Sequence, residues 1–464
     1  MEQVDLAVIG AGPAGLSAAL TAQAVGLSAT VIDENPRPGG QIFRQMPEAF
    51  RVARPEALGH TFQKGQALLE KVSGAGIQLK LGTTVWGVFH PLTLALHRGD
   101  STQSLRCRTL ILATGAYDHT MPFPGWTLPG VMTLGGAQAL VKGQRVLPGT
   151  RIVLAGSGPF LLPVAAQLLK GGARIVAILE ATRPRSWLGK AGVLWKQWER
   201  FREAWEYMRP IAAARVPVRF GQTIVAARGD QALEEVTVAS LDQEWRPVPG
   251  SEYALEADTA CVGFGFSINT QLSRLCGCDH QYSPGYGGWV VSHDSWQRTS
   301  AQNVLVAGEA TGIAGVDAAV AEGAIAGIGA ALSLGLISET EARKRAAPHR
   351  RRLGRMRPFA EMLGELFAPR EGLLDLITDE TVVCRCEEVT AAEVRQAIDS
   401  GARDVNGVKS RARAGMGLCQ GRVCGAIVAE LVARGTGQPV EEVGVFSARP
   451  IAKPVSLAAI ASME

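Results

Sequence analysis

Four of the eight cysteines lie close together near the end of this 464-residue chain. They form two pairs, Cys384-x-Cys386 and Cys419-x₄-Cys424, and 32 residues separate the pairs. Thiolates grouped in this way are the ligands of tetrahedral-sulfur sites, which hold zinc or an iron–sulfur cluster. Zinc pairs favour gaps of about two to four residues, so the single-residue gap favours a [2Fe–2S] cluster. Zinc and a cluster that has been lost are the alternatives.

A glycine-rich turn near the N-terminus has the composition of a phosphate-binding loop. It reads Gly10-Ala-Gly12-Pro13-Ala14-Gly15. Gly10 permits a tight turn, Gly12 lets a pyrophosphate approach the backbone, and Gly15 allows a helix to pack against a strand. The free N–H groups and positive dipole end of that helix then face the phosphates.

The elements that must position this turn can be read from its flanks. Residues 4–9 are apolar enough for a buried parallel strand, and an Ala/Leu-rich stretch to about residue 25 predicts a helix. A second strand is expected at 28–32. Asp33 follows it at the spacing of an acid that accepts from a ribose hydroxyl, and Glu34 is the neighbouring candidate.

Three further motifs favour FAD over NAD at this site. They are Pro38-Gly39-Gly40-Gln41, the strand end Ala113-Thr114-Gly115, and Gly308-Glu309 at the end of a third short strand, 303–308. These motifs look like those of flavoproteins built from two dinucleotide-binding folds. In that group a Gly-Asp pair in the last position holds the ribityl chain and pyrophosphate, and Glu309 keeps the acceptor.

A second glycine turn, Gly156-Ser-Gly158-Pro-Phe-Leu161, resembles the nicotinamide half of the same flavoproteins. Leu161 stands where Gly or Ala normally allows close packing of helix on strand. Glu180 ends the next strand, 174–179, where it could accept from a ribose hydroxyl and would repel a 2′-phosphate, which disfavours NADPH. A working nicotinamide site and a repurposed or empty one are both open, and the second is favoured.

Several classes of function are disfavoured. The second fold has no Cys-x-x-Cys, which argues against a dithiol mechanism, and Cys276-Gly-Cys278 is expected to be a structural turn. The net charge of +4 is too balanced for a nucleic-acid or membrane-surface protein. The N-terminus shows no basic signal region, and no run of about 20 apolar residues lacks charge. We therefore expect no transmembrane segment and a cytoplasmic protein.

The order of motifs predicts an α/β protein in which one dinucleotide-binding domain is interrupted by another. Residues 1–120 and 285–337 are expected to form the FAD-binding domain, and 121–284 the second, Rossmann-like domain. Residues 338–375 are rich in Arg and Lys and contain Pro348 and Pro358 as helix breakers, so a linker is expected there. Residues 376–464 form a small α-rich module that holds the four cysteines.

The cysteine module resembles a known family of domains. Cys384-Arg-Cys-Glu-Glu and Gly417-Leu-Cys-Gln-Gly-Arg-Val-Cys look like the bacterioferritin-associated-ferredoxin type of [2Fe–2S] domain. Together with the FAD motifs and Gly285-Tyr-Gly-Gly-Trp-Val-Val, the whole chain resembles the alpha (A-type) subunits of heteromeric flavin-dependent amine dehydrogenases. That group includes opine oxidase, D-hydroxyproline dehydrogenase, dye-linked L-proline dehydrogenase and hydrogen cyanide synthase, and sarcosine oxidase contains the same architecture.

The resemblance implies a subunit of an oxidoreductase that acts on CH–NH donors. An amino acid or opine would be oxidised on a separate FAD-containing beta chain, and this chain would relay electrons through FAD and [2Fe–2S] to a quinone or carrier. The resemblance also allows for an FMN at an interface between subunits, a small ferredoxin-like third chain, a second nucleotide (NAD or ATP/ADP), and peripheral attachment of the complex to the inner membrane.

No catalytic acid or base is identified, because the seven histidines are scattered and no acid/base pair stands at motif spacing. Three other functions stay open. The chain could be a stand-alone NADH-dependent reductase of a carrier protein, a hydrogen cyanide synthase subunit oxidising glycine, or a scaffold in which the cluster is only a structural staple.

Overall fold

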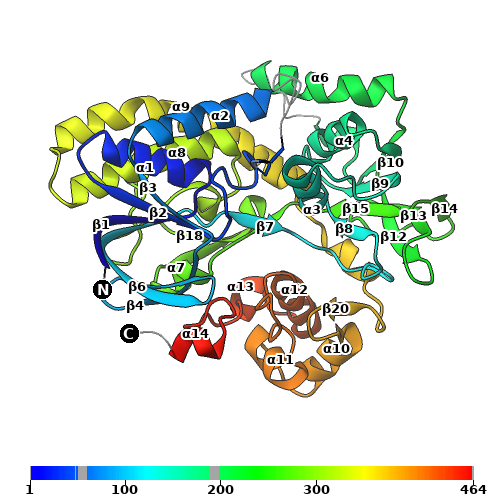
Figure 1. Cartoon of the computed structure of the whole chain (residues 1–464). Helices are drawn as coiled ribbons and strands as arrows, with labels where there is room; N and C mark the ends of the chain where they lie inside the picture. Colours follow the sequence, from blue (N-terminus) through cyan, green and yellow to red (C-terminus); the bar gives the residue numbers. More distant parts are fainter. Residues whose placement is uncertain (1, 48, 51–59, 188–197, 462–464) are drawn as a thin grey trace. The chain divides into compact units, whose positions relative to one another are not determined.

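The computed structural model describes residues 2–47, 49–50, 60–187 and 198–461 (Figure 1). The chain divides into two compact units. The first unit consists of Met1–Ala116, Ile268–Glu361 and Ala448–Glu464, and the second of Tyr117–Ser267 and Met362–Ser447. Each unit therefore contains segments that are far apart in the sequence.

The first unit is built on a mixed sheet with the strand order β3-β2-β1-β6-β5-β4, and β19 pairs with β6. The pairs among β3, β2, β1, β6 and β19 are parallel, whereas β4, β5 and β6 pair in antiparallel fashion. The bounds are β1 Glu2–Ile9, β2 Ala29–Asp33, β3 Gln78–Leu81, β4 Thr84–Phe89, β5 Thr93–Arg98, β6 Ser101–Leu112 and β19 Val304–Val306. The parallel strands therefore end at one edge, where the ligands of such sheets bind.

Helices α1 (Pro13–Gln23), α2 (His60–Gly74) and α8 (Val316–Ser333) lie together over one face of this sheet (Figure 1). Small residues let α1 and α8 approach closely. A Cβ atom at Gly323 would lie 2.0 Å from the carbonyl oxygen of Ala14. The hydroxyl of Ser17 donates to the carbonyl oxygen of Val320 over 2.8 Å. The glycine and alanine content of both helices thus serves their packing.

Helix α8 is also long and apolar enough to cross a membrane, the one such helix in the described part of the chain. Inside the protein, 72% of its apolar window is buried. Length and composition therefore do not assign it to a membrane.

The stretch 338–375, expected to be a linker broken at two prolines, is mostly helical. Helix α9 runs Glu339–Phe367 and continues through Pro348 and Pro358. Three of its side chains are buried in a cluster with α8 and Trp296, namely Ala342, Ala346 and Leu353. Burial of this face outweighs the two hydrogen bonds that the prolines remove, which is why the expectation of a break was wrong.

The second unit contains a parallel five-stranded sheet with the order β11-β10-β9-β15-β8. Helices α3 (Leu134–Ala139), α4 (Leu161–Lys170) and α6 (Trp198–Ala213) accompany it, and β12, β13 and β14 form an antiparallel sheet. The strands are β8 Val131–Thr133, β9 Arg151–Gly156, β10 Arg174–Glu180, β11 Val218–Phe220, β12 Gln222–Arg228, β13 Glu235–Ser240, β14 Tyr253–Glu256 and β15 Thr259–Gly263. This is the second dinucleotide-binding fold that the repeated turn predicts.

The cysteine module belongs to the same unit. It comprises the short pair β20 (Val382–Cys384) and β21 (Val389–Thr390), followed by helices α10 to α13. The helices are α10 Ala391–Asp399, α11 Val405–Ala412, α12 Gly425–Thr436 and α13 Val440–Val443. The side chain of Thr390 and that of Glu393 cap the start of α10 reciprocally.

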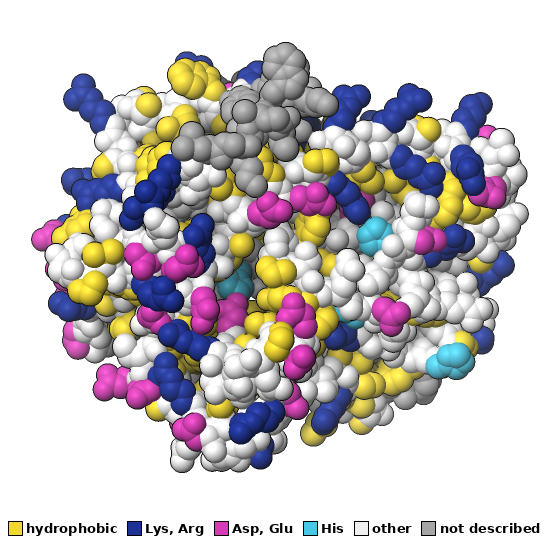
Figure 2. Space-filling model, turned by 180° about the vertical axis from the view of Figure 1, so that it is seen from behind, with side chains coloured by type: hydrophobic (Ala, Val, Ile, Leu, Met, Phe, Trp, Pro, Cys, Tyr) yellow, Lys and Arg dark blue, Asp and Glu magenta, His cyan; other side chains and the backbone are white. Residues whose placement is uncertain are grey.

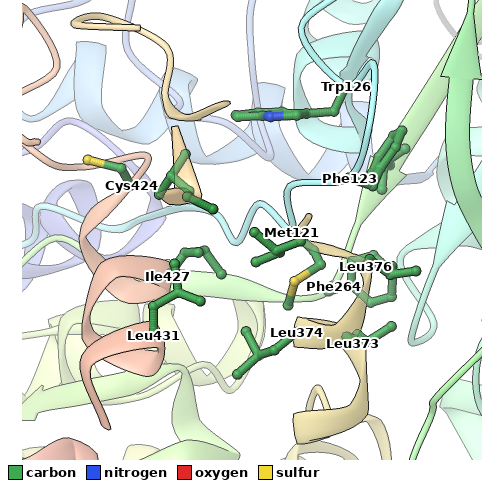
Figure 3. Close-up of a cluster of buried hydrophobic side chains, with 14 of the residues drawn as sticks. Met121, Phe123, Trp126, Phe264, Leu373, Leu374, Leu376, Cys424, Ile427 and Leu431 are labelled. Atoms are coloured by element: carbon green, nitrogen blue, oxygen red, sulfur yellow. The ribbon is translucent and has the colours of Figure 1, made fainter. Parts of the chain in front are cut away.

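One continuous hydrophobic cluster holds the second fold and the cysteine module together (Figure 3). In Figure 3, Ile427 and Leu431 point from α12 toward Met121 and Leu374. The indole Nε1 of Trp126 donates to the carbonyl oxygen of Val382 over 2.6 Å. The sequence suggested a separate module, but its apolar face is completed by the neighbouring fold, so the two form one unit.

Basic and acidic side chains are intermixed on the face seen in Figure 2. Several arginines of the basic stretch in α9 have partners within the first unit. Arg352 lies 2.7 Å from Asp317, and the guanidinium of Arg350 stacks on Trp296 at 4.1 Å. Part of this positive charge is therefore used in packing α9.

Candidate functional site

The four motifs of the first glycine site meet at the carboxyl edge of the β1–β6 sheet. The N–H of Gly39 donates to the carbonyl of Ala11 over 2.8 Å. A Cβ atom at Gly10 would lie 2.2 Å from the carbonyl oxygen of Ala113. A Cβ at Gly308 would lie 2.7 Å from the Cβ of Ala14. Segments that are far apart in the sequence thus line one cradle.

The geometry of the turn fits a pyrophosphate at the start of α1. Pro13 occupies the first turn of α1, where its missing N–H costs nothing. A Cβ at Gly15 would lie 1.9 Å from the carbonyl oxygen of Gly10, so the helix can begin this close to β1 only with glycine there. Next to Gly12, the nearest heavy atom is the Cα of Gly40 at 3.9 Å from where a Cβ would stand. The cradle is therefore open where a phosphate approaches the backbone.

The two acids at the end of β2 have different partners. Asp33 accepts from the N–H of Ala11 over 2.6 Å and from the N–H of Asn35 over 2.7 Å. Carboxylate oxygens accept more than one hydrogen bond, so Asp33 can still accept from a ribose hydroxyl. Glu34 instead accepts from the ammonium of Lys453. Of the two sequence candidates, Asp33 is the one fixed against the glycine turn.

The Gly308-Glu309 motif is held by a buried carboxylate of helix α8, that of Glu322. Glu322 is 1% exposed and accepts from the N–H of Gly308 over 3.0 Å. The hydroxyl of Thr311 (2.7 Å) and the guanidinium of Arg357 (3.1 Å) donate to the same carboxylate. Burial raises the pKa of Glu309 to about 7, and the Glu322 charge adds to this effect.

The remaining predicted FAD residues flank this cradle. The hydroxyl of Thr114 donates to the carbonyl of Asn269 over 2.9 Å, and the carbonyl of Gly115 accepts from the N–H of Asn269. Gln41 accepts from Arg44 over 2.6 Å. These contacts fix the two segments that lie beside the glycine turn.

The second glycine turn repeats the acid of the first. Glu180 is 8% exposed and accepts from the N–H of Gly158 over 2.9 Å and from the N–H of Thr182 over 2.8 Å. Burial raises its pKa to about 7, against these two hydrogen bonds, which lower it. The carboxylate is thus built into the turn.

The helix after the second turn starts later, and the turn is covered. Helix α4 begins at Leu161, five residues after Gly156, whereas α1 begins three residues after Gly10. The ring of Phe367, at the end of α9, lies 3.5 Å from where a Cβ of Gly158 would stand. The hydroxyl of Ser157 donates to the carbonyl of Phe367 over 2.6 Å. The side of the turn that would face a pyrophosphate is therefore in contact with the chain itself.

The four thiols of the cysteine module meet as two pairs. Cys384 hydrogen-bonds with Cys424, and Cys386 with Cys419, so each pair takes one thiol from each half of the motif. A Cβ at Gly417 would lie 2.2 Å from the Cβ of Cys386, so glycine is required for this approach. Across residues 2–47, 49–50, 60–187 and 198–461, no three His, Cys, Asp or Glu side chains converge as ligands of a single metal ion. Two pairs fit a two-iron cluster better than one zinc ion.

Backbone N–H groups surround the innermost thiol. The hydrogen bond with Cys424 and the N–H groups of Gly415, Glu387 and Cys386 lower the pKa of Cys384 to about 5, against burial. The same thiol–thiol bond and burial raise the pKa of Cys424. N–H donors of this kind stabilise the thiolates that ligate iron.

Each of the two cysteine motifs contains an arginine, and each of these arginines stacks on an aromatic ring of the second unit. Arg385 lies 5.3 Å from the ring centroid of Trp126, and Arg422 lies 5.8 Å from that of Tyr117. Arg422 also donates to the carbonyl of Cys419 over 3.0 Å. The aromatic rings thus fix the guanidinium groups of two residues that neighbour the cysteines in sequence.

The other four cysteines are not placed for chemistry. Cys107, Cys261, Cys276 and Cys278 carry free thiols. Burial raises the pKa of Cys107, Cys261 and Cys276 to about 12, so they stay protonated at neutral pH. Cys276-Gly-Cys278 is a structural turn, as the sequence predicted.

The first unit and its cradle define a flavoprotein of the type with two dinucleotide-binding folds. The family model of pyridine nucleotide-disulphide oxidoreductases matches residues 4–323, and the chain belongs to that family. The model of the sarcosine oxidase A3 domain matches residues 378–464. The expected fold class is thereby confirmed, and the chain is a flavin oxidoreductase that binds FAD.

The relatives agree with the resemblance seen in the sequence. Hydrogen cyanide synthase subunit HcnB of Pseudomonas aeruginosa is 34% identical over 93% of this chain and 93% of the relative. The A-type subunit of opine oxidase from Rhizobium meliloti is 34% identical over 100% of this chain and 88% of the relative. The structure of L-proline dehydrogenase from P. horikoshii superimposes with a TM-score of 0.70 at 21% identity, covering 99% of this chain and 80% of that one. The expected kinship with A-type subunits is confirmed.

Three residues that bear on the sites were not found from the sequence. Arg357 reaches Glu322, Phe367 covers the second turn, and Lys453 reaches Glu34. The last two partners stand 210 and 419 residues from the positions they contact. No local spacing signal connects residues so far apart.

Proposed function

We propose that this chain is the electron-transfer subunit of a heteromeric dehydrogenase or oxidase of amino acids, opines or related secondary amines, and that it carries FAD and a [2Fe–2S] cluster. The carrying observation is the meeting of Cys384 with Cys424 and of Cys386 with Cys419 in a chain that also has an FAD cradle. When bound, FAD would accept one hydride, which carries two electrons, and would release these electrons one at a time, and a [2Fe–2S] cluster would carry one electron.

The chain's own residues divide the work between the two units. In the first, the glycine turn and Asp33 bind the ADP half of FAD, and Glu322 orients the Gly308 N–H. In the second, the N–H groups of Gly415, Glu387 and Cys386 hold a thiolate. Arg422 donates to the carbonyl of Cys419 and so fixes the backbone of the second cysteine motif.

Two observations support a separate catalytic subunit. The relatives are named as subunits of opine oxidase and of hydrogen cyanide synthase. Two acids of the FAD cradle have structural roles: the half-buried Asp33 holds the glycine turn, and the buried Glu322 holds the Gly308 motif. The amine would therefore be oxidised on a partner chain.

The identity with HcnB makes a hydrogen cyanide synthase the second candidate for the complex, with glycine as the substrate that the sequence resemblance implies. A stand-alone NADH-dependent reductase is disfavoured, because Phe367 covers the second turn and α4 starts late. These alternatives differ in what reduces the flavin.

The test is to purify the chain alone and together with a co-expressed catalytic subunit. The chain alone should contain FAD and about two irons, show a [2Fe–2S] signal by electron paramagnetic resonance after reduction, and leave opines, proline and glycine unoxidised. The complex should reduce a dye with one of these amines. Amine oxidation by the chain alone would contradict the proposal.

A pair of variants separates the cysteine site from the FAD site. Cys386→Ser should lose the iron and the dye reduction of the complex while keeping FAD. The matched control Cys276→Ser removes a thiol of the first unit and should keep both cofactors. Dye reduction that survives the loss of iron would favour the structural-staple alternative.

A further inference from the structure

The chain returns to the first unit after the cysteine module. Ala448–Glu464 belongs to the unit that holds the FAD cradle. Ala452 is 6% exposed, and its N–H donates to the carbonyl of Trp86 in β4 over 2.6 Å. Its methyl group is part of the apolar cluster beneath the sheet. Burial and a backbone hydrogen bond therefore fix the position of the next residue, Lys453.

The ammonium of Lys453 lies at the acidic end of β2. It donates to Glu34, and the Lys453 side chain is 24% exposed. Burial lowers the pKa of Lys453, whereas the charge of Asp33 raises it. The ammonium of Lys453 therefore also interacts electrostatically with Asp33. Lys453 is thus placed beside both acids that the sequence offered as ribose partners.

The carboxylates of Asp33 and Glu34 affect the binding of a dinucleotide in different ways. Asp33 is oriented by Ala11 and Asn35, which leaves it facing the glycine turn. A second, unbalanced carboxylate at Glu34 would repel the anionic pyrophosphate that the same turn must receive. A cation bound to Glu34 removes this repulsion without touching the hydrogen bonds of Asp33.

We propose that Lys453 completes the adenosine end of the FAD site by neutralising Glu34. Asp33 is then the acid that accepts from the ribose, and Glu34 is the anchor of the C-terminal segment. Lys453 is a positioning residue, since it acts on the site through Glu34. The inference rests on FAD binding and not on the electron-transfer role.

The position of Lys453 also sets a ligand preference. The residues around it contact the part of the cradle that receives the ADP half of FAD. Ligands that contain this half, FAD and ADP, should depend on Lys453. FMN lacks the adenosine and the second phosphate. Its binding, which we expect to be weaker, should therefore not depend on Lys453.

The test measures the affinity of flavin-free full-length protein for FAD, FMN and ADP, by flavin fluorescence and by competition. Lys453→Met should raise the dissociation constant for FAD about tenfold, which corresponds to about 1.4 kcal/mol. ADP should be weakened to the same extent, and FMN should be unaffected. Lys453→Arg keeps the charge and should bind FAD like the unaltered protein.

A second substitution makes the mechanism specific. Glu34→Gln removes the charge that Lys453 balances, so the double variant Lys453→Met/Glu34→Gln should regain most of the lost FAD affinity. Arg108→Met, which breaks an exposed ion pair with Asp5 in the same unit, is the control. An unchanged FAD dissociation constant in Lys453→Met, or no recovery in the double variant, would overturn the proposal. Failure of the electron-transfer role would leave these affinities as expected.

Discussion

The two glycine turns of this chain have the same strand–turn–helix plan and differ in what lies over them. After the first, α1 begins within three residues and the turn faces a cradle lined by motifs from four segments. After the second, α4 begins at Leu161 and the turn contacts Phe367 of α9. The nucleotide-binding plan can therefore persist as architecture while its ligand face is used for packing.

An acid at the end of the second strand is common to both turns. Asp33 accepts from the N–H of Ala11, and Glu180 accepts from the N–H of Gly158. In both turns the carboxylate holds the backbone of the loop. Such an acid is thus a structural part of the turn first, and it indicates a ribose site only when the turn is open.

The largest effect, on flavin content, should come from comparing variants of the last residue of each glycine turn, Gly15 in the first and Leu161 in the second. Gly15→Ala places a Cβ 1.9 Å from the carbonyl oxygen of Gly10, so α1 must move away from β1. The flavin content per chain should fall at least about tenfold, since overpacking against backbone costs about 1–3 kcal/mol or more. Leu161→Ala, at the equivalent buried position, should lower stability but keep the flavin. A Gly15→Ala protein with full flavin content would contradict the assignment of the first turn as the ligand-binding one.

A smaller effect is expected from uncovering the second turn. Phe367→Ala removes the ring over Gly158 and should lower the free energy of unfolding of the second unit by about 2 kcal/mol, measured in urea. NADH should not bleach the flavin of this variant, because α4 still begins only at Leu161. Rapid bleaching in the variant would show that Phe367 alone closes a working site.

The smallest expected effect is on how the flavin midpoint potential depends on pH. Glu309 and Glu180 both have a pKa raised to about 7 by burial. Glu309 lies in the Gly308-Glu309 motif of the proposed FAD site, so its loss of a proton as the pH rises through 7 adds negative charge there and should lower the flavin midpoint potential. Glu309→Gln should remove this inflection from potentials measured between pH 5 and 9, and Glu180→Gln should retain it. If the inflection disappears with Glu180→Gln instead, the proton linked to the flavin potential belongs to Glu180 in the second unit, which would contradict this prediction.

The same two acids should also make stability depend on pH. Their folded-state pKa lies above the unfolded value, so each carboxyl favours the folded state below about pH 4.5, and this contribution is lost as the pH rises to about 7. Both substitutions to Gln should therefore flatten the fall in unfolding free energy across this range, as measured by urea unfolding at a series of pH values.

Much of the first site could be predicted from the sequence because its signals are local. The turn Gly10–Gly15, the strand end at Ala113 and the Gly308 motif each carry their own spacing, and parallel strands bring their ends to one edge. The cysteine pairs were recognisable for the same reason. Their cross-pairing, Cys384 with Cys424, was not, because it depends on how α12 and β20 pack.

The expectations that failed depended on tertiary packing. Pro348 and Pro358 are strong local breakers, yet α9 continues because Ala342, Ala346 and Leu353 are buried against α8. Likewise, no sequence signal near Glu34 indicates its contact with Lys453, because Lys453 lies 419 residues further along the chain. Local propensity is overruled where a buried face or an ion pair is supplied by a distant segment.

The discontinuity of the first unit has a consequence for how the protein is made. Its three segments, Met1–Ala116, Ile268–Glu361 and Ala448–Glu464, leave the ribosome separately, with the whole second unit synthesised in between. The β1–β6 sheet must wait for β19 and α8, and Glu34 must wait for Lys453. Completion of the flavin cradle is therefore a late event in biosynthesis, and a ribosome-stalled chain that ends before the last segment would present an unfinished cradle to FAD.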